Sequence, residues 1–207
     1  MTDNTISKPT RPDALRVIEA VVADWEQTSG LHKGQSEEEL TAQIVEALRT
    51  AGVALLAEPR SWTALADIIV PPNLVGVPAH LVQPGNDLVA NCMIWSGPAD
   101  FGLALDRLLR GLTKQDRSAA LIVFVREGGV MQVVQRAKEA SQKHHAFGNF
   151  GKGKSETQLE LWLSISKHPD KVIPTTLLFC NLFEGVQKGM PEDDGEPEPW
   201  EPEYGIF

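Results

Sequence analysis

The pattern of apolar and polar residues is clearest between residues 87 and 125. An apolar run from Leu88 to Trp95 is followed by a Leu-rich amphipathic segment from Asp100 to Leu112, and then by a second apolar run from Ala119 to Val125. These runs predict a strand, a helix and a strand joined by short connectors, a crossover unit with two parallel and buried strands. We expect the rest of the chain to pack around this unit.

Two amphipathic helices are predicted before this unit. The first runs from about Arg11 to Gln27, with Pro12 near its first turn and apolar residues spaced for one buried face. The second opens with Ser36 and Glu39 in capping-box spacing and ends at Gly52.

Apolar runs punctuated by proline lie between the second helix and the crossover unit and predict a β meander. The runs are Val53 to Ala57, Ala66 to Val70 and Leu74 to Val82. Pro84-Gly85-Asn86 predicts a hairpin turn that leads from the last run into the strand at Leu88.

After Val125 the pattern predicts a helix, a loop and two strands. The helix covers Val130 to Lys143, and the polar, Gly- and Lys-rich segment from His144 to Ser155 is expected to be an exposed loop. Two strands are predicted, from Gln158 to Ile165 and from Val172 to Phe183. Apolar and polar residues alternate in the first, which implies one solvent-exposed face, and we therefore expect both strands towards an edge of the sheet. The whole order predicts an α/β fold with a mixed central sheet flanked by helices.

Composition narrows the class of protein. The 207 residues are 42% hydrophobic, enough for a substantial core, and no run of about 18 apolar residues is present, so no membrane span is expected. The first residues lack an apolar signal core, and we therefore expect a cytoplasmic protein. Cys92 and Cys180 lie in apolar runs without zinc-like spacing and are expected to be buried free thiols.

The net charge of -9 is distributed unevenly. The tail from Pro191 to Phe207 carries seven acids and no base, whereas Arg107 to Ser155 carries ten bases and three acids. We divide the chain into a polar segment and helix (residues 1–35), a main domain (36–187) and an acidic tail (188–207) expected to be disordered or folded onto something else.

Several strings in the main domain resemble one nuclease group. They are Asn91-Cys92-Met93-Ile94-Trp95-Ser96-Gly97, Ala104-Leu105-Asp106-Arg107-Leu108-Leu109 and the apolar strand from Ala119. These strings look like the core of a bacterial restriction-endonuclease-like group in the PD-(D/E)xK superfamily, which commonly reads Glu-Cys-Lys, an aromatic residue and Gly. The resemblance implies a restriction-endonuclease-like core over roughly residues 36 to 186.

The catalytic positions depart from that pattern. By the resemblance, an Asp and a Glu hold Mg²⁺ and a Lys assists the attacking hydroxide. Here the Glu position is Asn91 and the Lys position is Met93, and the Gln of the helix is Arg107. The Asp position is either Asp67, by residue likeness, or Ala79, by hairpin length. Asn supplies a neutral oxygen and Met neither a charge nor a proton, so no catalytic residue and no metal ligand can be assigned.

The loss of these groups favours a pseudo-nuclease that acts as a nucleic-acid-binding or partner-binding subunit, for example in bacterial defence or DNA processing. A second hypothesis is an active nuclease with relocated ligands such as Asp67, Asp87 or Asp106, the one case in which a cofactor, Mg²⁺, is expected. A third is a regulatory interaction module in which Trp200, Tyr204 and Phe207 of the acidic tail anchor in a basic groove, either this protein's own or a partner's. A protein partner or a homo-oligomer is also expected.

Basic residues supply the candidates for nucleic-acid binding. One group lies on or just after the central helix, and the other lies in the Gly-rich loop with Phe147 and Phe150 available for stacking. The candidates are Arg107, Arg110, Lys114, Arg117, Lys152 and Lys154. His80, His144 and His145 form no metal-binding or catalytic pattern in the sequence.

Overall fold

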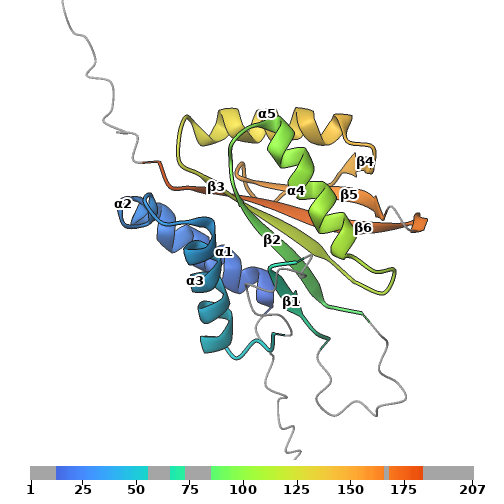
Figure 1. Cartoon of the computed structure of the whole chain (residues 1–207), viewed down its shortest axis with the longest axis horizontal. Coiled ribbons are helices and arrows are strands. Elements are labelled where there is room, and N and C mark those ends of the chain that lie inside the picture. Colours follow the sequence, from blue (N-terminus) through green and yellow to red (C-terminus); the bar gives the residue numbers. More distant parts are fainter. Residues whose placement is uncertain (1–12, 56–65, 73–84, 166–167, 184–207) are drawn as a thin grey trace, which may run out of the picture.

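The fold is a mixed six-stranded sheet covered on both faces by helices (Figure 1). The computed structural model describes residues 13–55, 66–72, 85–165 and 168–183. Its helices are α1 (Ala14–Gln27), α2 (Ser29–His32), α3 (Glu37–Thr50), α4 (Pro98–Gly111) and α5 (Val130–Lys143). Its strands are β1 (Ile68–Val70), β2 (Leu88–Ile94), β3 (Ala119–Val125), β4 (Phe147–Phe150), β5 (Gln158–Ile165) and β6 (His168–Asn181).

The strands lie in the order β1-β2-β3-β6-β5-β4. The three central strands β2, β3 and β6 are parallel, whereas β1 pairs with β2, and β5 with β6 and β4, in antiparallel fashion. The β2-α4-β3 segment is the crossover unit that the apolar pattern predicts. Every residue of β3 is buried, as expected for a parallel strand covered on both faces.

Alternate residues of β3 contribute to two separate cores. Leu121 and Val123 pack with α4 and α5 on one face, and Ile122 and Phe124 pack with α1 and α3 on the other. Large side chains are fully buried on both faces, for example Phe101 of α4 on the α4–α5 face and Ile18 of α1 on the α1–α3 face. The helix layers therefore hold the sheet from both sides.

The helix α1 belongs to the same core as the sheet. Its buried residues Ile18, Val22 and Trp25 pack with residues of α3, β2 and β3. The boundary predicted near residue 36 therefore does not separate two cores. No helix in the described ranges combines the length and the apolar character that crossing a bilayer requires.

Most predicted elements are confirmed, including the capping box at Ser36 and the central crossover. Four details differ. Val53–Leu55 form no strand, and the polar segment after His144 contains the short edge strand β4. The strand β6 lies inside the sheet between β3 and β5, and β5 lies between β6 and β4, so neither is an edge. The predicted strand from Leu74 to Val82 and the tail lie outside the described residues.

Candidate functional site

The candidate site forms where β1 enters the sheet beside β2. Asp67 immediately precedes β1, and its amide donates to the Ala90 carbonyl oxygen at 3.1 Å. The Asp67 carboxylate in turn accepts from the Cys92 amide, with an Oδ2 to N distance of 2.7 Å. This pairing places Asp67 next to Asn91, so the described strand beside β2 is the one that carries Asp67. Ala79 lies outside the described residues.

Asn91 lies in the middle of β2 and is fully buried. When its amide is oriented to satisfy its neighbours, Oδ1 accepts from Arg107 Nε at 3.1 Å and Nδ2 donates to the Ala90 carbonyl at 3.0 Å. Met93, two residues further on, points to the same face as Asn91 and is 4% exposed within the apolar core. The position expected for a lysine therefore holds a packed apolar side chain.

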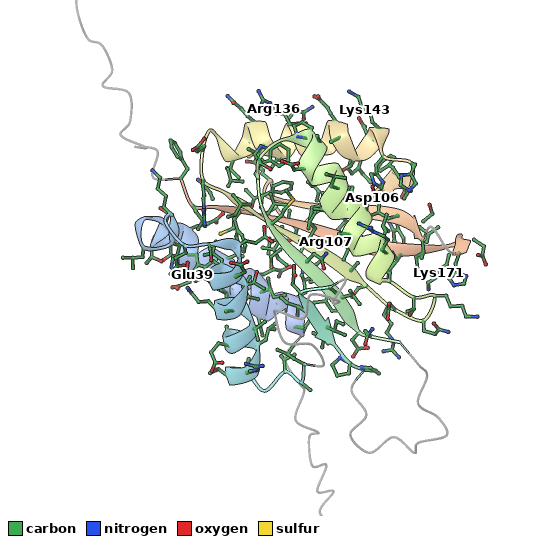
Figure 2. All side chains as sticks on the ribbon, in the orientation of Figure 1. Glu39, Asp106, Arg107, Arg136, Lys143 and Lys171 are labelled. Carbon is green, nitrogen blue, oxygen red and sulfur yellow. The ribbon has the colours of Figure 1, made fainter. Side chains whose placement is uncertain are left out.

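Arg107 projects from α4 into this cluster (Figure 2). One guanidinium nitrogen donates to the Cys92 carbonyl oxygen at 2.9 Å. The same nitrogen lies 3.6 Å from Asp67 Oδ2 and 3.7 Å from Glu37 Oε1. Arg107 is therefore the cation that two carboxylates and a buried amide share.

Glu37 is brought to the site by the start of α3. Ser36 caps that helix, with Glu39 completing the capping box, which leaves Glu37 in the first helical turn. Its Oε2 accepts from the Ile94 amide at 3.2 Å, so the carboxylate joins the end of β2 to α3. The sequence offers three consecutive glutamates and does not reveal which of them turns towards the sheet, and Glu37 was missed for that reason.

The electrostatics of the cluster follow from burial. Desolvation raises the pKa of Asp67 above its usual range, partly offset by the Cys92 amide hydrogen bond and by Arg107. Desolvation likewise raises the pKa of Glu37, against the lowering effects of Arg107 and the Ile94 amide. Burial also raises the pKa of the Cys92 thiol well above its normal value. Arg107 and the two backbone amides therefore favour the charged form of each carboxylate against the effect of burial.

A groove with a volume of about 440 Å³ opens beside the cluster. Its walls mix both signs of charge with apolar side chains, and include Glu37, Met93, Asp100, Arg107 and Arg110. Met93, an apolar residue that is 4% exposed, contributes to its wall. The groove therefore gives access to a site whose polar groups already satisfy one another.

The six basic candidates fall into different environments. Arg107 is engaged by Glu37 and Asp67 in the half-buried cluster, and it is therefore not counted as part of a nucleic-acid surface. Arg117 pairs with Asp87 at 3.0 Å, and Lys154 pairs with Glu19 at 2.8 Å. The remaining three, Arg110, Lys114 and Lys152, are exposed.

The two aromatic rings of the Gly-rich segment, Phe147 and Phe150, already contact each other and a lysine. Phe147 and Phe150 begin and end the edge strand β4, and their ring centroids lie 4.9 Å apart. The Lys138 ammonium lies 5.4 Å above the Phe150 ring. Their mutual packing leaves only part of each ring for stacking with a base.

The three carboxylates considered as ligands of a relocated nuclease site, Asp67, Asp87 and Asp106, each contact different side chains. Asp67 contacts Arg107, Asp87 contacts Arg117, and Asp106 lies near His144 and His145. In the part of the chain that the structure describes, the one group of three or more His, Cys, Asp or Glu side chains close enough to share an ion is that of Asp106, His144 and His145.

No protein-family model, curated protein or solved structure matches this chain. The class that the structure defines is an α/β protein with a mixed sheet between two helix layers. Any closer assignment depends on the residues of the cluster and on the resemblance described above.

Proposed function

We propose that the chain has a restriction-endonuclease-like core with a silent active site, and that it binds nucleic acid rather than cleaving it. The observation that supports this proposal is the position of Arg107. Its guanidinium lies 3.6 Å from Asp67 and its Nε contacts the Asn91 amide, so a cation of the protein itself engages two of the positions that, by the resemblance, would bind the metal ion.

The residues do not fit Mg²⁺. That ion requires near-octahedral oxygen ligands and usually at least one carboxylate without a competing cation. Here the Glu position is a neutral amide engaged by Arg107 Nε, and both nearby carboxylates face the Arg107 guanidinium. An incoming divalent ion would have to displace a cation bound to the protein itself. No catalytic step through a metal ion is therefore assigned to this cluster.

The choice of nucleic acid as the ligand rests on the charge of the two helix layers. The layer of α1 and α3 carries seven acids and two bases, whereas the layer of α4 and α5 carries three acids and, besides Arg107, four bases. Exposed bases of the second layer include Arg110 on α4. On α5 they include Arg136 and Lys143 (Figure 2). Phosphate groups favour such a surface because binding releases counterions.

A cleavage assay tests the first half of the proposal. Single-stranded and double-stranded DNA and RNA are incubated with the full chain and either Mg²⁺ or Mn²⁺. We expect no metal-dependent cleavage, and the same background for wild type and for Asp67→Asn. Cleavage that Asp67→Asn abolishes would overturn the silent site and support the relocated nuclease instead.

Anisotropy with labelled oligonucleotides at several salt concentrations tests the second half. The double variant Arg110→Gln/Lys143→Gln should weaken binding and lower the salt slope by about 1 for each phosphate contact removed. The matched control, Arg16→Gln/Arg49→Gln, removes the same charge from the opposite layer and should bind like wild type. Equal losses in both double variants would contradict the α4–α5 surface.

The regulatory module remains the alternative class of function. Deleting residues 191–207 should leave nucleic-acid affinity and oligomeric state unchanged if the α4–α5 surface carries binding. If the deletion instead changes the oligomeric state measured by size exclusion, or abolishes binding, the tail carries the function through a protein partner or a second copy.

A further inference from the structure

Two consecutive histidines lie against a carboxylate on the side of α4 that does not contribute to the Arg107 cluster. His144 caps the C-terminus of α5, and His145 follows it, so both rings are placed by the end of one helix. Asp106 comes from the neighbouring helix α4, which packs against α5. Asp106 and Arg107 are adjacent in α4 and point about 100° apart around the helix, which separates the two groups.

The distances between the three side chains are those of a small coordination sphere. Asp106 Oδ1 lies 3.3 Å from His144 Nε2 and 3.9 Å from His145 Nε2, and the three ligand atoms all lie within 4.8 Å of one another. Tetrahedral Zn²⁺ with bonds of about 2.0–2.2 Å requires ligand atoms about 3.3–3.5 Å apart. The first pair already meets this spacing, and a small rotation of His145, whose side chain is 64% exposed, brings in the third atom.

Burial also suits His144 to act as a metal ligand, because its side chain is only 8% exposed and its ring is held beside Asp106. A neutral imidazole is the form that binds metal. His144 Nε2 is buried and lies 3.3 Å from Asp106 Oδ1, in a geometry too poor for a well-formed hydrogen bond. A metal ion bound by both atoms would satisfy this nitrogen better.

One contact competes with metal binding. His144 Nδ1 accepts from the Ala146 amide at 3.3 Å, which in the neutral ring leaves the proton on Nε2. Ligation through Nε2 moves that proton to Nδ1 and ends the contact with Ala146. The amide of Ala146 therefore reports directly on occupancy.

We propose that Asp106, His144 and His145 form a site for a divalent transition-metal ion of the zinc class, with a fourth position open to solvent. Two imidazoles and one carboxylate favour Zn²⁺ over Mg²⁺, which prefers oxygen ligands. A bound ion would link the middle of α4 to the connection between α5 and β4. This proposal is independent of the silent nuclease site, because it shares no residue with the Arg107 cluster.

Calorimetric titration of the tag-free full chain with Zn²⁺ tests the site. We expect saturable binding of one equivalent, a higher melting temperature with Zn²⁺ than without it, and a shifted Ala146 amide resonance. Replacing Zn²⁺ by Co²⁺ should give the visible absorption bands of a tetrahedral or five-coordinate ion, which excludes loose surface binding.

Two variants and one control identify the ligands. His145→Ala changes an exposed side chain and should fold normally, yet it should weaken Zn²⁺ binding at least about tenfold, as should Asp106→Asn. His168→Ala, at the start of β6, removes a histidine outside the site and should bind like wild type. Absence of one-equivalent binding, or equal binding by wild type, His145→Ala and Asp106→Asn, overturns the proposal.

Discussion

Replacing Arg107 with Gln tests whether this arginine holds the half-buried cluster of Glu37, Asp67 and Asn91 together. The change keeps a good helix former in α4 but removes the cation shared by Glu37 and Asp67. It also removes the guanidinium donor to the Cys92 carbonyl oxygen, at 2.9 Å, and leaves the buried Asn91 amide without its Arg107 partner.

The expected cost follows from these contacts. A hydrogen bond from a charged donor contributes about 1.5–3 kcal/mol. The side chains of Arg107, Glu37 and Asp67 are 39%, 38% and 29% exposed, and water therefore screens their ion contacts to about 0–1 kcal/mol each. We expect the free energy of unfolding to fall by about 2–4 kcal/mol near neutral pH.

The loss should depend on pH with a definite sign. Burial raises the pKa of both carboxyl groups, so the folded state binds protons more tightly than the unfolded state and loses stability as pH rises through the folded pKa values. Arg107 opposes this shift, and without it both pKa values rise further. The gap between variant and wild type should therefore be smaller at about pH 4 than at about pH 7.

Urea unfolding followed by tryptophan fluorescence measures both quantities, provided that the slope of free energy against urea is unchanged. The matched control is Arg110→Gln, one turn further along α4, where the exposed guanidinium donates only to the Asp106 carbonyl of its own helix among its described hydrogen bonds. The control should change stability by no more than about 0.5 kcal/mol. Equal losses in both variants, or a pH-independent gap, would refute the shared-cation role of Arg107.

Three further changes test the fold around the site. Ser36→Ala removes the acceptor for the Glu39 amide and should cost about 1 kcal/mol in urea unfolding, and an unchanged midpoint would contradict the cap. Gly85→Ala places a Cβ against the Gln115 carbonyl oxygen at φ +128° and should cost at least about 2 kcal/mol in urea unfolding. Gly102→Ala has open space around it and should stabilise α4 by about 0.5–1 kcal/mol, and the reverse order of stabilities would refute this reasoning. Burial raises the pKa of the Cys92 and Cys180 thiols, so native protein should resist thiol reagents until urea unfolds it, and rapid native labelling would contradict their burial.

The elements that the sequence predicts well are those with a strong local signal. Ala119 to Val125 is an unbroken apolar run, and its bounds match β3. The short strand β4 escapes prediction because Phe147 and Phe150 flank Gly148 and Asn149, residues that favour turns, and only pairing with β5 makes the segment extended. The position of β6 between β3 and β5 is likewise set by long-range strand pairing. The alternation of apolar and polar residues in β5 shows which side chains are buried but not which strands are neighbours.

The candidate site was predictable only in part. Residue likeness pointed to Asp67 and Asn91, which β1 and β2 bring side by side. Glu37 and the inward turn of Arg107 depend on how α3 and α4 pack on the sheet, and a charged residue on an amphipathic helix looks the same in sequence whether it faces water or a cluster. The approach of Asp106 to His144 has the same origin, because 38 positions separate them in the chain.

The position of β6 also constrains how this protein can be made. β6 is the last strand along the described chain, yet it joins β3 on one side to β5 on the other. A nascent chain that ends before residue 168 would expose two unpaired strand edges, each rich in buried apolar residues. Such an intermediate is prone to aggregate, so interrupted synthesis or C-terminal truncation into β6 should produce insoluble chains rather than shortened but folded protein.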